Sequence, residues 1–316
     1  MFKDFRDSLP VILLAMATLA HAAQLSTNAL AAIPHNVEQL VVIDSRALQN
    51  STVAMELRDR VTPPELKKFE DALTNSGLND NHDVDQLVFA AFHPEGSEDQ
   101  ALTVGIAQGQ FTPQTIQANF RKQKIKPTIV RTYQLYPMAK TDMVVCFVDS
   151  STMVFGGPGA VKKALDARDG AAANLLTNTP MTDAMKTVDF EPFWSILDEK
   201  GTQATMRQML GDAGSVTNFE SVRERLLSSS YSMNFQHGVK FDFTLSTGDS
   251  FAAATLSTLI NTAVEVRKLS CSEAEKQALS ATSINSDTGR LSIHFATSDS
   301  EFSSLLQSPL FQSIVH

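Results

Sequence analysis

The stretch "DQLVFAAFHPEGSEDQALTVGIAQG" (Asp85–Gly109) contains two apolar runs, "DQLVFAAFH" and "ALTVGIAQG", separated by the polar segment "PEGSEDQ". Two β-rich runs joined by a short polar segment with Gly and Pro are typical of an antiparallel hairpin. A doubly wound parallel sheet would instead place a helix between consecutive strands. The stretch therefore predicts a fold built around antiparallel pairing.

Helices and strands follow one another irregularly on both sides of this hairpin. The strand candidate "QLVVIDS" (Gln39–Ser45) precedes two helical stretches, 47–60 and 63–77, and a further helix begins after Thr112. The later strand candidates are "PTIVRTYQLYPM" (127–138), "DMVVCFVD" (142–149) and "TMVFGG" (152–157). This order predicts an α+β fold with mainly antiparallel sheets and helices packed on one face of each.

The second half of the chain repeats this order. "FWSILDEKGTQATMRQMLGD" (Phe193–Asp212) resembles "LVVIDSRALQNSTVAMELRD" (Leu40–Asp59), and a second predicted hairpin follows it. We therefore predict two related tandem modules, residues 23–170 and 171–316, that diverged after an internal duplication. The connection Ala167–Pro180, rich in Ala and Asn, marks the boundary. Whether the modules share one sheet is left open. The apolar helix expected over Phe251–Leu269 should lie deep in the second module or against a partner.

The first 22 residues have the pattern of an export signal. Lys3 and Arg6 precede the apolar run Leu9–Ala20, and Ala20-His21-Ala22 has small residues at the spacing that a signal peptidase accepts. A short N-terminal helix is the alternative, since about 20 apolar residues are needed to span a bilayer. We expect a periplasmic or extracellular protein with no transmembrane span in the mature chain.

The formal net charge of −9 makes nucleic acid an unfavourable partner, because an acidic protein repels phosphate backbones. The one basic cluster, "FRKQKIKP" (120–127), suits a solvated helix end, with anionic lipid headgroups as the alternative.

Cys146 and Cys271 are the only cysteines. Export would allow them to pair, but Cys146 lies in a strand-like run where cysteine is commonly a small buried residue.

The glycine-rich turn "FGGPGAVKK" (155–163) is the most enzyme-like motif in the chain. A P-loop requires Lys and then Ser or Thr directly after its last glycine, whereas Ala160 and Val161 follow Gly159. A dinucleotide fingerprint requires glycine at position 162, which is Lys. Pro158 suits the first position of a helix. We therefore predict a strand-to-helix turn, with weak anion binding at the helix N-terminus as the alternative.

No metal or catalytic site emerges from the remaining polar residues. The acidic segment "LNDNHDVDQL" (78–87), with Asp80, His82, Asp83 and Asp85, lacks the Gly and Glu that a calcium loop of the EF-hand type requires. No two histidines are four residues apart, and the chain contains neither a Gly-x-Ser-x-Gly nor a Ser-x-x-Lys motif. We therefore assign no catalytic, cofactor-binding or metal-binding residue and expect no cofactor.

Aromatic usage favours apolar contacts over sugar binding, because the chain has 19 Phe but one Trp and three Tyr. Phe and the 11 Met would line either the core or an apolar pocket between the sheet and its helices.

Four segments, "AAIPHNVEQLVVIDSRAL", "SGLNDNHDVDQLVFAAF", "GIAQGQF" and "VFGGPGAVKKALD", together resemble a broad class of exported bacterial α+β proteins of unknown role. The resemblance covers the first module and fades after about Ala167. It implies export and an α+β fold, and it assigns no site residue, because the shared motifs are structural turns.

Three functions remain open from the sequence. The first is a non-enzymatic binding or scaffolding protein of the cell envelope with an unknown protein partner. The second is a periplasmic carrier of an apolar ligand or lipid, and the third is a hydrolase with a dispersed active site.

Overall fold

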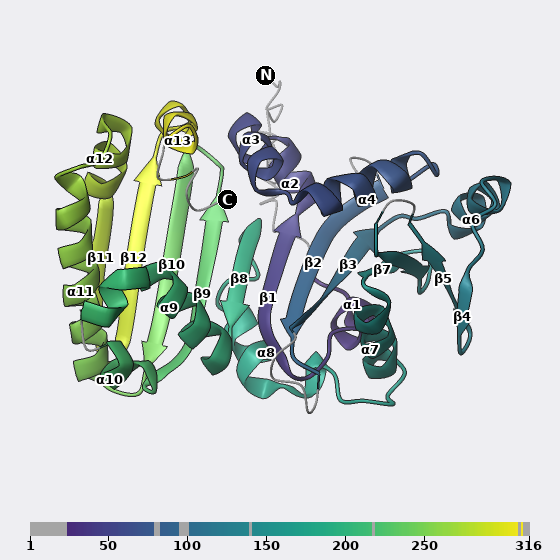
Figure 1. The fold of residues 1–316 in the computed structure, drawn as a ribbon, viewed down its shortest axis with the longest axis horizontal. Coiled ribbons are helices and arrows are strands. Elements are labelled where there is room, and N and C mark those ends of the chain that lie inside the picture. Colours follow the sequence, from purple (N-terminus) through teal and green to yellow (C-terminus); the bar gives the residue numbers. More distant parts are fainter. Residues whose placement is uncertain are drawn as a thin grey trace, which may run out of the picture.

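A computed structural model describes residues 24–78, 83–94, 101–138, 141–216, 219–308 and 311, without the side chains of residues 65, 208–216, 220 and 221. One twelve-stranded sheet runs through the whole molecule, in the order β11-β12-β10-β9-β8-β1-β2-β3-β7-β6-β5-β4 (Figure 1). Every pair of neighbouring strands in it is antiparallel. The α+β fold expected from the sequence is therefore confirmed.

The strands fall into two groups along the chain. The first half contributes β1 (Val37–Asp44), β2 (Val84–Phe92), β3 (Leu102–Gly109), β4 (Thr128–Val130), β5 (Tyr133–Pro137), β6 (Val144–Phe147) and β7 (Thr152–Gly156). The second half contributes β8 (Phe193–Leu197), β9 (Leu226–Asn234), β10 (Val239–Thr247), β11 (Thr282–Asp287) and β12 (Arg290–Thr297). The β2–β3 pair is the hairpin predicted from Asp85–Gly109.

The helices lie between these strands. Those of the first half are α1 (Thr27–Ala31), α2 (Ser45–Gln49), α3 (Thr52–Val61), α4 (Pro64–Thr74), α6 (Pro113–Lys122) and α7 (Pro158–Arg168). A 3₁₀ turn (Leu175–Thr177) and α8 (Thr179–Met185) lead into the second half, which holds α9 (Glu199–Val216), α10 (Phe219–Arg223), α11 (Ser250–Lys268), α12 (Glu273–Ser280) and α13 (Asp299–Leu306).

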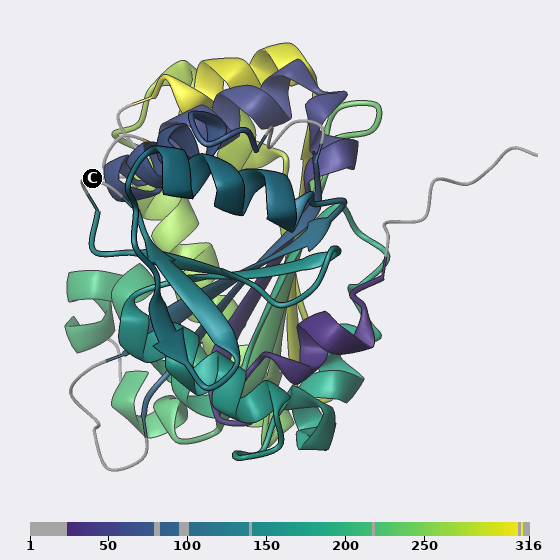
Figure 2. The ribbon, with the colours of Figure 1, turned by 90° about the vertical axis from the view of Figure 1, so that its right-hand side faces the viewer.

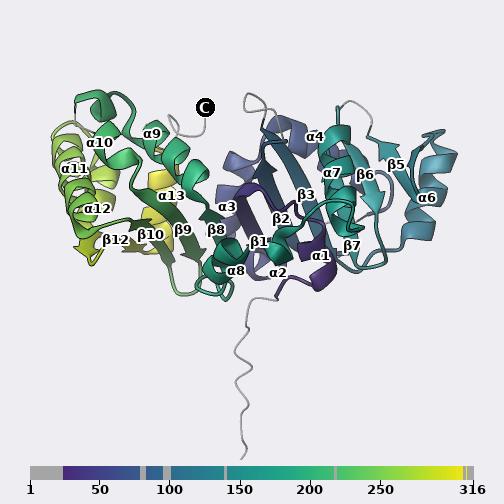
Figure 3. The same cartoon turned by 90° about the horizontal axis from the view of Figure 1, so that it is seen from below.

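The two halves of the sheet join through the pairing of β1 with β8, which lie side by side at the middle of the molecule (Figure 3). In this pairing Leu40 lies opposite Ile196 and Val42 lies opposite Trp194. All four side chains are buried in one core cluster. The question that the sequence left open is thereby answered, since both halves belong to one continuous sheet.

The pairing register shows which residues of neighbouring strands point to the same side of the sheet. One side, which we call the α7 face, carries Leu40, Val88, Ile106 and Val154, and these pack with side chains of α1, α7 and α8. The opposite side, the α4 face, includes Phe155 in the first half, where α4 and α6 cover it. Figure 2 shows helices both above and below the strands of this half.

From β9 onward, the helices of the second half cover the α4 face of the sheet, whereas α8 packs on the α7 face of β8. On the α4 face, Phe243 and Leu245 of β10 pack with α9, α10 and α11, and Phe295 of β12 packs with α13. The α7 face of β9 and β10 carries polar side chains instead, such as Ser230 and Thr244. An antiparallel sheet tolerates water on one side, which explains this alternation.

The structure corrects three expectations. Helices cover one face from β9 onward, as expected, but both faces in the first half, because β1, β2 and β3 are apolar on both sides. The predicted strand 127–138 is two short strands, β4 and β5, which turn at Arg131, whose φ is 54°. The apolar helix at Phe251–Leu269 does not lie deep in the second module, because it is buried only along part of its N-terminal half and Leu269 directly after it is 88% exposed, while packing against a partner stays a prediction.

Candidate functional site

The glycine-rich turn is a strand-to-helix connection, as predicted. Gly156 ends β7 with a φ of 138°, and Gly157 is the N-cap of α7, with Pro158 at the first position of the helix. A side chain at Gly156 would meet the carbonyl oxygen of Thr103 at 3.1 Å. The helix then buries Val161, as the sequence pattern indicated.

Only part of the acidic segment 78–87 lies within the described residues. Asp80 and His82 lie outside the described residues. The Asp83 carbonyl oxygen accepts a hydrogen bond from the Gln110 amide, and the Asp85 carboxylate pairs with Arg46 at 2.5 Å. Across the described ranges, no group of three or more His, Cys, Asp or Glu residues is placed to hold a metal ion.

The two cysteines are both free and lie far apart in the fold. Cys146 is buried in β6, and Cys271 lies between α11 and α12; Figure 3 shows β6 and these two helices toward opposite ends of the sheet. Burial raises the pKa of the Cys146 thiol to about 12. A thiol with this pKa stays protonated at neutral pH, so Cys146 acts as a small apolar core residue.

Histidines form three polar pairs on different elements. The Nδ1 atoms of His35, His93 and His294 lie 2.9, 2.9 and 2.7 Å from oxygen atoms of Thr177, Glu38 and Asp242, respectively. His294 and Asp242 are both exposed, opposite each other on β12 and β10. The segments of His35 and His93 adjoin, since the Asn36 side chain donates to the His93 carbonyl oxygen, whereas the His294 pair lies in the second half of the sheet. We assign no hydrolase residue among these pairs.

An apolar groove lies between the α4 face of the sheet and the helices α2, α3 and α4. It consists of two adjoining cavities that share six residues: Ser45, Arg58, Leu66, Glu70, Leu87 and Phe89. The first cavity encloses about 510 Å³ of empty space and the second about 660 Å³, in both cases partly open to solvent. We call these two cavities together the helix–sheet groove.

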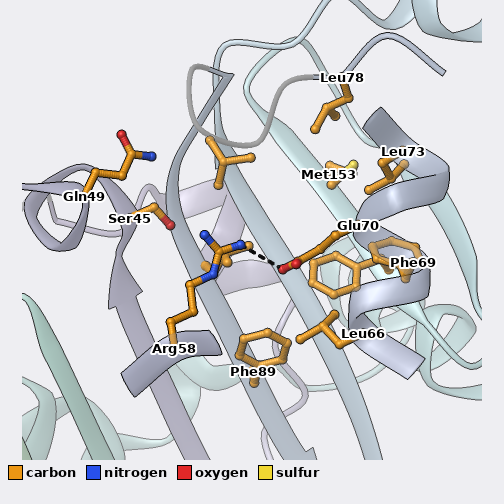
Figure 4. A pocket seen from close by; sticks show the side chains of 13 residues that line it. Ser45, Gln49, Arg58, Leu66, Phe69, Glu70, Leu73, Leu78, Phe89 and Met153 are labelled. Carbon is orange, nitrogen blue, oxygen red and sulfur yellow. Dashed lines mark hydrogen bonds and ion pairs between the residues drawn. The ribbon is translucent and has the colours of Figure 1, made fainter. Parts of the chain in front are cut away.

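Stacked aromatic rings form the floor and one wall of the first cavity (Figure 4). The Phe69 ring of α4 stacks on Phe155 of β7 with centroids 4.9 Å apart, and Phe89 of β2 meets Phe155 edge to face at 5.9 Å. Gly105 makes this arrangement possible, because a Cβ there would come within 2.2 Å of the Phe155 ring. The wall is therefore built from three different elements.

Two helices supply the opposite wall of the groove. Asp44 accepts a hydrogen bond from the Ala47 amide at 2.8 Å and starts α2 directly after β1. Ser51 caps α3 in the same way, through the Ala54 amide at 3.2 Å. Side-chain oxygens at this position satisfy amides that would otherwise lack a partner. The helices start so close to the sheet that their side chains reach the groove.

One ion pair spans the groove from α3 to α4. The Arg58 guanidinium donates to the Glu70 carboxylate at 3.1 Å, as the dashed line in Figure 4 marks. Both side chains are about one quarter exposed, at 27% and 24%. Among the residues that line both cavities, these two are the charged ones. The ion pair thus forms a polar bridge over an otherwise mostly apolar space.

A second groove, polar in character, lies on the uncovered α7 face of the second half. Hydroxyl groups of β9 and β10 line it on one side and α8 with the segment after it on the other, and it encloses about 1220 Å³ of space, much of it open to solvent. Phe190, at 57% exposure, is its one large exposed apolar residue. We call it the polar groove.

A cluster of titratable groups lies at one end of the β1–β8 pairing. The Asp198 amide donates to the Glu38 carbonyl oxygen, and the Glu38 carboxylate lies 2.9 Å from His93 Nδ1. Burial, together with the charge of Glu38, raises the pKa of Asp198 to about 6, although a hydrogen bond from the Gly201 amide acts in the opposite direction. At the junction of the two halves, the ionised form of the Asp198 carboxyl is therefore destabilised.

Sequence reasoning anticipated part of the helix–sheet groove. The abundance of Phe and Met indicated either a core or an apolar pocket between sheet and helices, and Phe69, Phe89, Phe155 and Met153 do line the groove. The sequence did not reveal the Arg58–Glu70 pair. The sequence placed Arg58 and Glu70 on two predicted helices separated by Pro63 and Pro64, but it did not indicate that these side chains meet.

In the described part of the chain, no helix is long and apolar enough to cross a membrane.

No protein-family model matches the chain, and no curated protein sequence matches it. Two of the solved structures that match do so over most of their length. Crystal form I of TP0453 has a TM-score of 0.52 and 12% identity, over 90% of this chain and 98% of that chain. Crystal form III of TP0453 has a TM-score of 0.55 and 11% identity, over 89% and 98%. At this identity the similarity concerns the fold alone. This chain is therefore similar to TP0453 in its α+β fold.

Proposed function

We propose that this protein is a non-enzymatic binding protein that carries an apolar ligand in the helix–sheet groove. The observation that supports this is the groove itself, which is lined mainly by apolar side chains of α2–α4 and the sheet and is crossed by the Arg58–Glu70 ion pair. Ligand sites are typically concave, mostly apolar and equipped with a few convergent polar groups. Burial of apolar ligand surface in the groove would contribute about 25 cal/mol for each Å² removed from water.

The size of the groove limits what it holds. Each cavity encloses only a few side chains' worth of space, about 510 Å³ in the first and about 660 Å³ in the second, part of it open to solvent. A slender ligand would follow both cavities beneath the Arg58–Glu70 bridge. A bulkier ligand would require α4 to move away from the sheet, at the expense of the Phe69–Phe155 contact.

Export and the internal duplication belong to the same proposal. Residues 1–22, which have the signal pattern, lie outside the described residues, so export to the periplasm or beyond rests on the sequence alone. Duplication into modules 23–170 and 171–316 is supported by the strand order, which is β1-β2-β3-β7-β6 on one side of the junction and β8-β9-β10-β12-β11 on the other. An envelope carrier would deliver its ligand between membranes or from a membrane to an acceptor.

Native mass spectrometry of protein purified from its own envelope fraction tests the proposal. We expect an additional mass of a few hundred daltons that organic extraction removes. The Leu87→Trp variant fills a position shared by both cavities and should lose this mass. The matched control is Ile129→Trp, at a site on β4 that is 61% exposed, and it should keep the mass. A wild-type protein with no bound mass and no stabilisation by added lipid would contradict the proposal.

Binding of a protein partner is a second proposal, and the polar groove is the observation that favours it. Its floor consists of hydroxyl side chains of β9 and β10, most of them half-buried, and beside them lies the exposed ring of Phe190, which would serve a partner as an apolar anchor. Thr244→Arg would place a long cation in this groove. A defined complex isolated from the envelope should be lost in Thr244→Arg and retained in Leu87→Trp, whereas retention in both variants would exclude the polar groove as the interface.

A further inference from the structure

The polar side chains of the helix–sheet groove gather on one side of its first cavity. In Figure 4, Ser45, Gln49 and Arg58 lie on one side, and Leu66, Phe69 and Leu73 lie on the other. Ser45 and Gln49 both come from α2, and Arg58 comes from α3. A ligand in this cavity would therefore meet hydrogen-bonding groups at one of its sides and apolar groups at the other.

All three polar side chains on that side carry hydrogen-bond donors. Arg58 has a planar guanidinium that suits a carboxylate, Gln49 has an amide NH₂, and Ser45 has a hydroxyl. On the basis of the proposed carrier function, we propose that the ligand is a single-chain amphiphile with a carboxylate headgroup, bound by Arg58 with Ser45 and Gln49. The carboxylate takes the position on Arg58 that Glu70 occupies in this structure.

The sign of the headgroup follows from the chemistry of the ion pair. Arginine keeps its charge at all accessible pH values, so Arg58 needs an anionic partner whenever it faces the apolar wall. A carboxylate ligand preserves this pairing, while the displaced Glu70, already one quarter exposed, turns to water. A cationic headgroup would instead meet the permanent positive charge of Arg58 at close range, and this repulsion is unfavourable.

The width of the groove favours one chain over two. The two cavities adjoin at residues that include Arg58 and Glu70, and they enclose about 510 and 660 Å³, partly open to solvent. One unbranched alkyl chain fits such a space along Phe69 and Phe155 with little movement of α4. A diacyl lipid would have to separate α4 from the sheet.

Three ligands with the same alkyl chain test this inference: dodecanoate, dodecanol and dodecyltrimethylammonium. Each is titrated into the full-length delipidated protein below its aggregation concentration, and binding is measured by calorimetry and native mass spectrometry. We expect dodecanoate to bind more tightly than dodecanol by about tenfold or more, since a hydrogen bond to a charged group is worth that much. The cationic amphiphile should bind most weakly.

Variants separate the headgroup contact from the groove. Arg58→Gln should abolish the advantage of dodecanoate over dodecanol, and Arg58→Lys should keep part of it. Glu70→Gln removes the competing carboxylate and should strengthen dodecanoate binding. The matched control is Arg60→Gln on the same helix, whose partner is Glu56 and which lines neither cavity. Thermal unfolding of each variant verifies that it folds.

The outcomes distinguish this inference from the proposed function. If dodecanoate and dodecanol bind equally and Arg58→Gln changes neither, the headgroup assignment is overturned and the apolar carrier stands. A preference for the cationic amphiphile that Glu70→Gln removes would overturn the assignment in favour of Glu70. If none of the three ligands binds the wild-type protein, the carrier function fails, and the headgroup assignment fails with it.

Discussion

Replacing Asp198 by Asn should stabilise the protein at neutral pH. Asp198 lies at the junction of the two halves, between β8 and α9, and its Oδ1 atom accepts the Gly201 amide at 2.8 Å. Asparagine accepts this hydrogen bond equally well at a helix start. The substitution therefore removes the charge of the side chain, while the local hydrogen bond is kept.

The magnitude follows from the raised pKa of Asp198. Burial and the charge of Glu38 raise this pKa from 3.8 to about 6. At about 1.4 kcal/mol per unit, the full difference corresponds to about 3 kcal/mol. Because the carboxylate keeps part of its contact with water, we expect Asp198→Asn to raise the free energy of unfolding by about 1–3 kcal/mol above pH 6.

The sign of the pH dependence is also determined. In the wild-type protein the folded state binds the Asp198 proton more tightly than the unfolded state. This contribution to stability is fully present below about pH 3.8 and is lost as the pH rises through about 6. The advantage of Asp198→Asn over wild type should therefore be largest above pH 6 and should shrink as the pH falls from about 6 to about 4.

Urea unfolding of wild type and variant at about pH 7.5, 6 and 4.5 measures this difference. Asp249→Asn is a control of opposite sign. Hydrogen bonding by the Ala252 amide and the charge of Arg225 lower the pKa of Asp249, which caps α11, so its replacement should destabilise the protein at neutral pH. A stability difference for Asp198→Asn that is the same at all three pH values would refute a raised pKa at this position.

Two further predictions concern packing and thiol reactivity. Gly105→Ala should lower the free energy of unfolding by about 1–3 kcal/mol, because the new Cβ would overlap the Phe155 ring. Gly159→Ala, with no atom within 4 Å of the new Cβ, should have little effect in the same urea experiment. Iodoacetamide should label Cys271 in the native protein and Cys146 only after unfolding, as followed by intact mass; equal labelling rates would contradict the buried, high-pKa state of Cys146.

Local signals were sufficient for most individual elements. The hairpin of β2 and β3, the turn at Gly156 and Gly157, and the caps of the short helices depend on residues close together in the sequence. Such features arise from backbone preferences and neighbouring hydrogen bonds, which a sequence displays directly. Burial was harder to predict from the sequence than the positions of the elements. The exposed end of α11 is an example, because apolar composition alone does not state which side of a helix meets the sheet.

The sequence by itself determined an antiparallel α+β fold, the positions of the main turns, and an apolar composition suited to a core or a pocket. Only the tertiary structure decided how the two halves join, because the pairing of Leu40 with Ile196 connects strands far apart in the chain. It also decided where Arg58 and Glu70 meet and which aromatic rings line the groove beside them. These contacts depend on how helices pack on a sheet, and a one-dimensional pattern does not contain that packing.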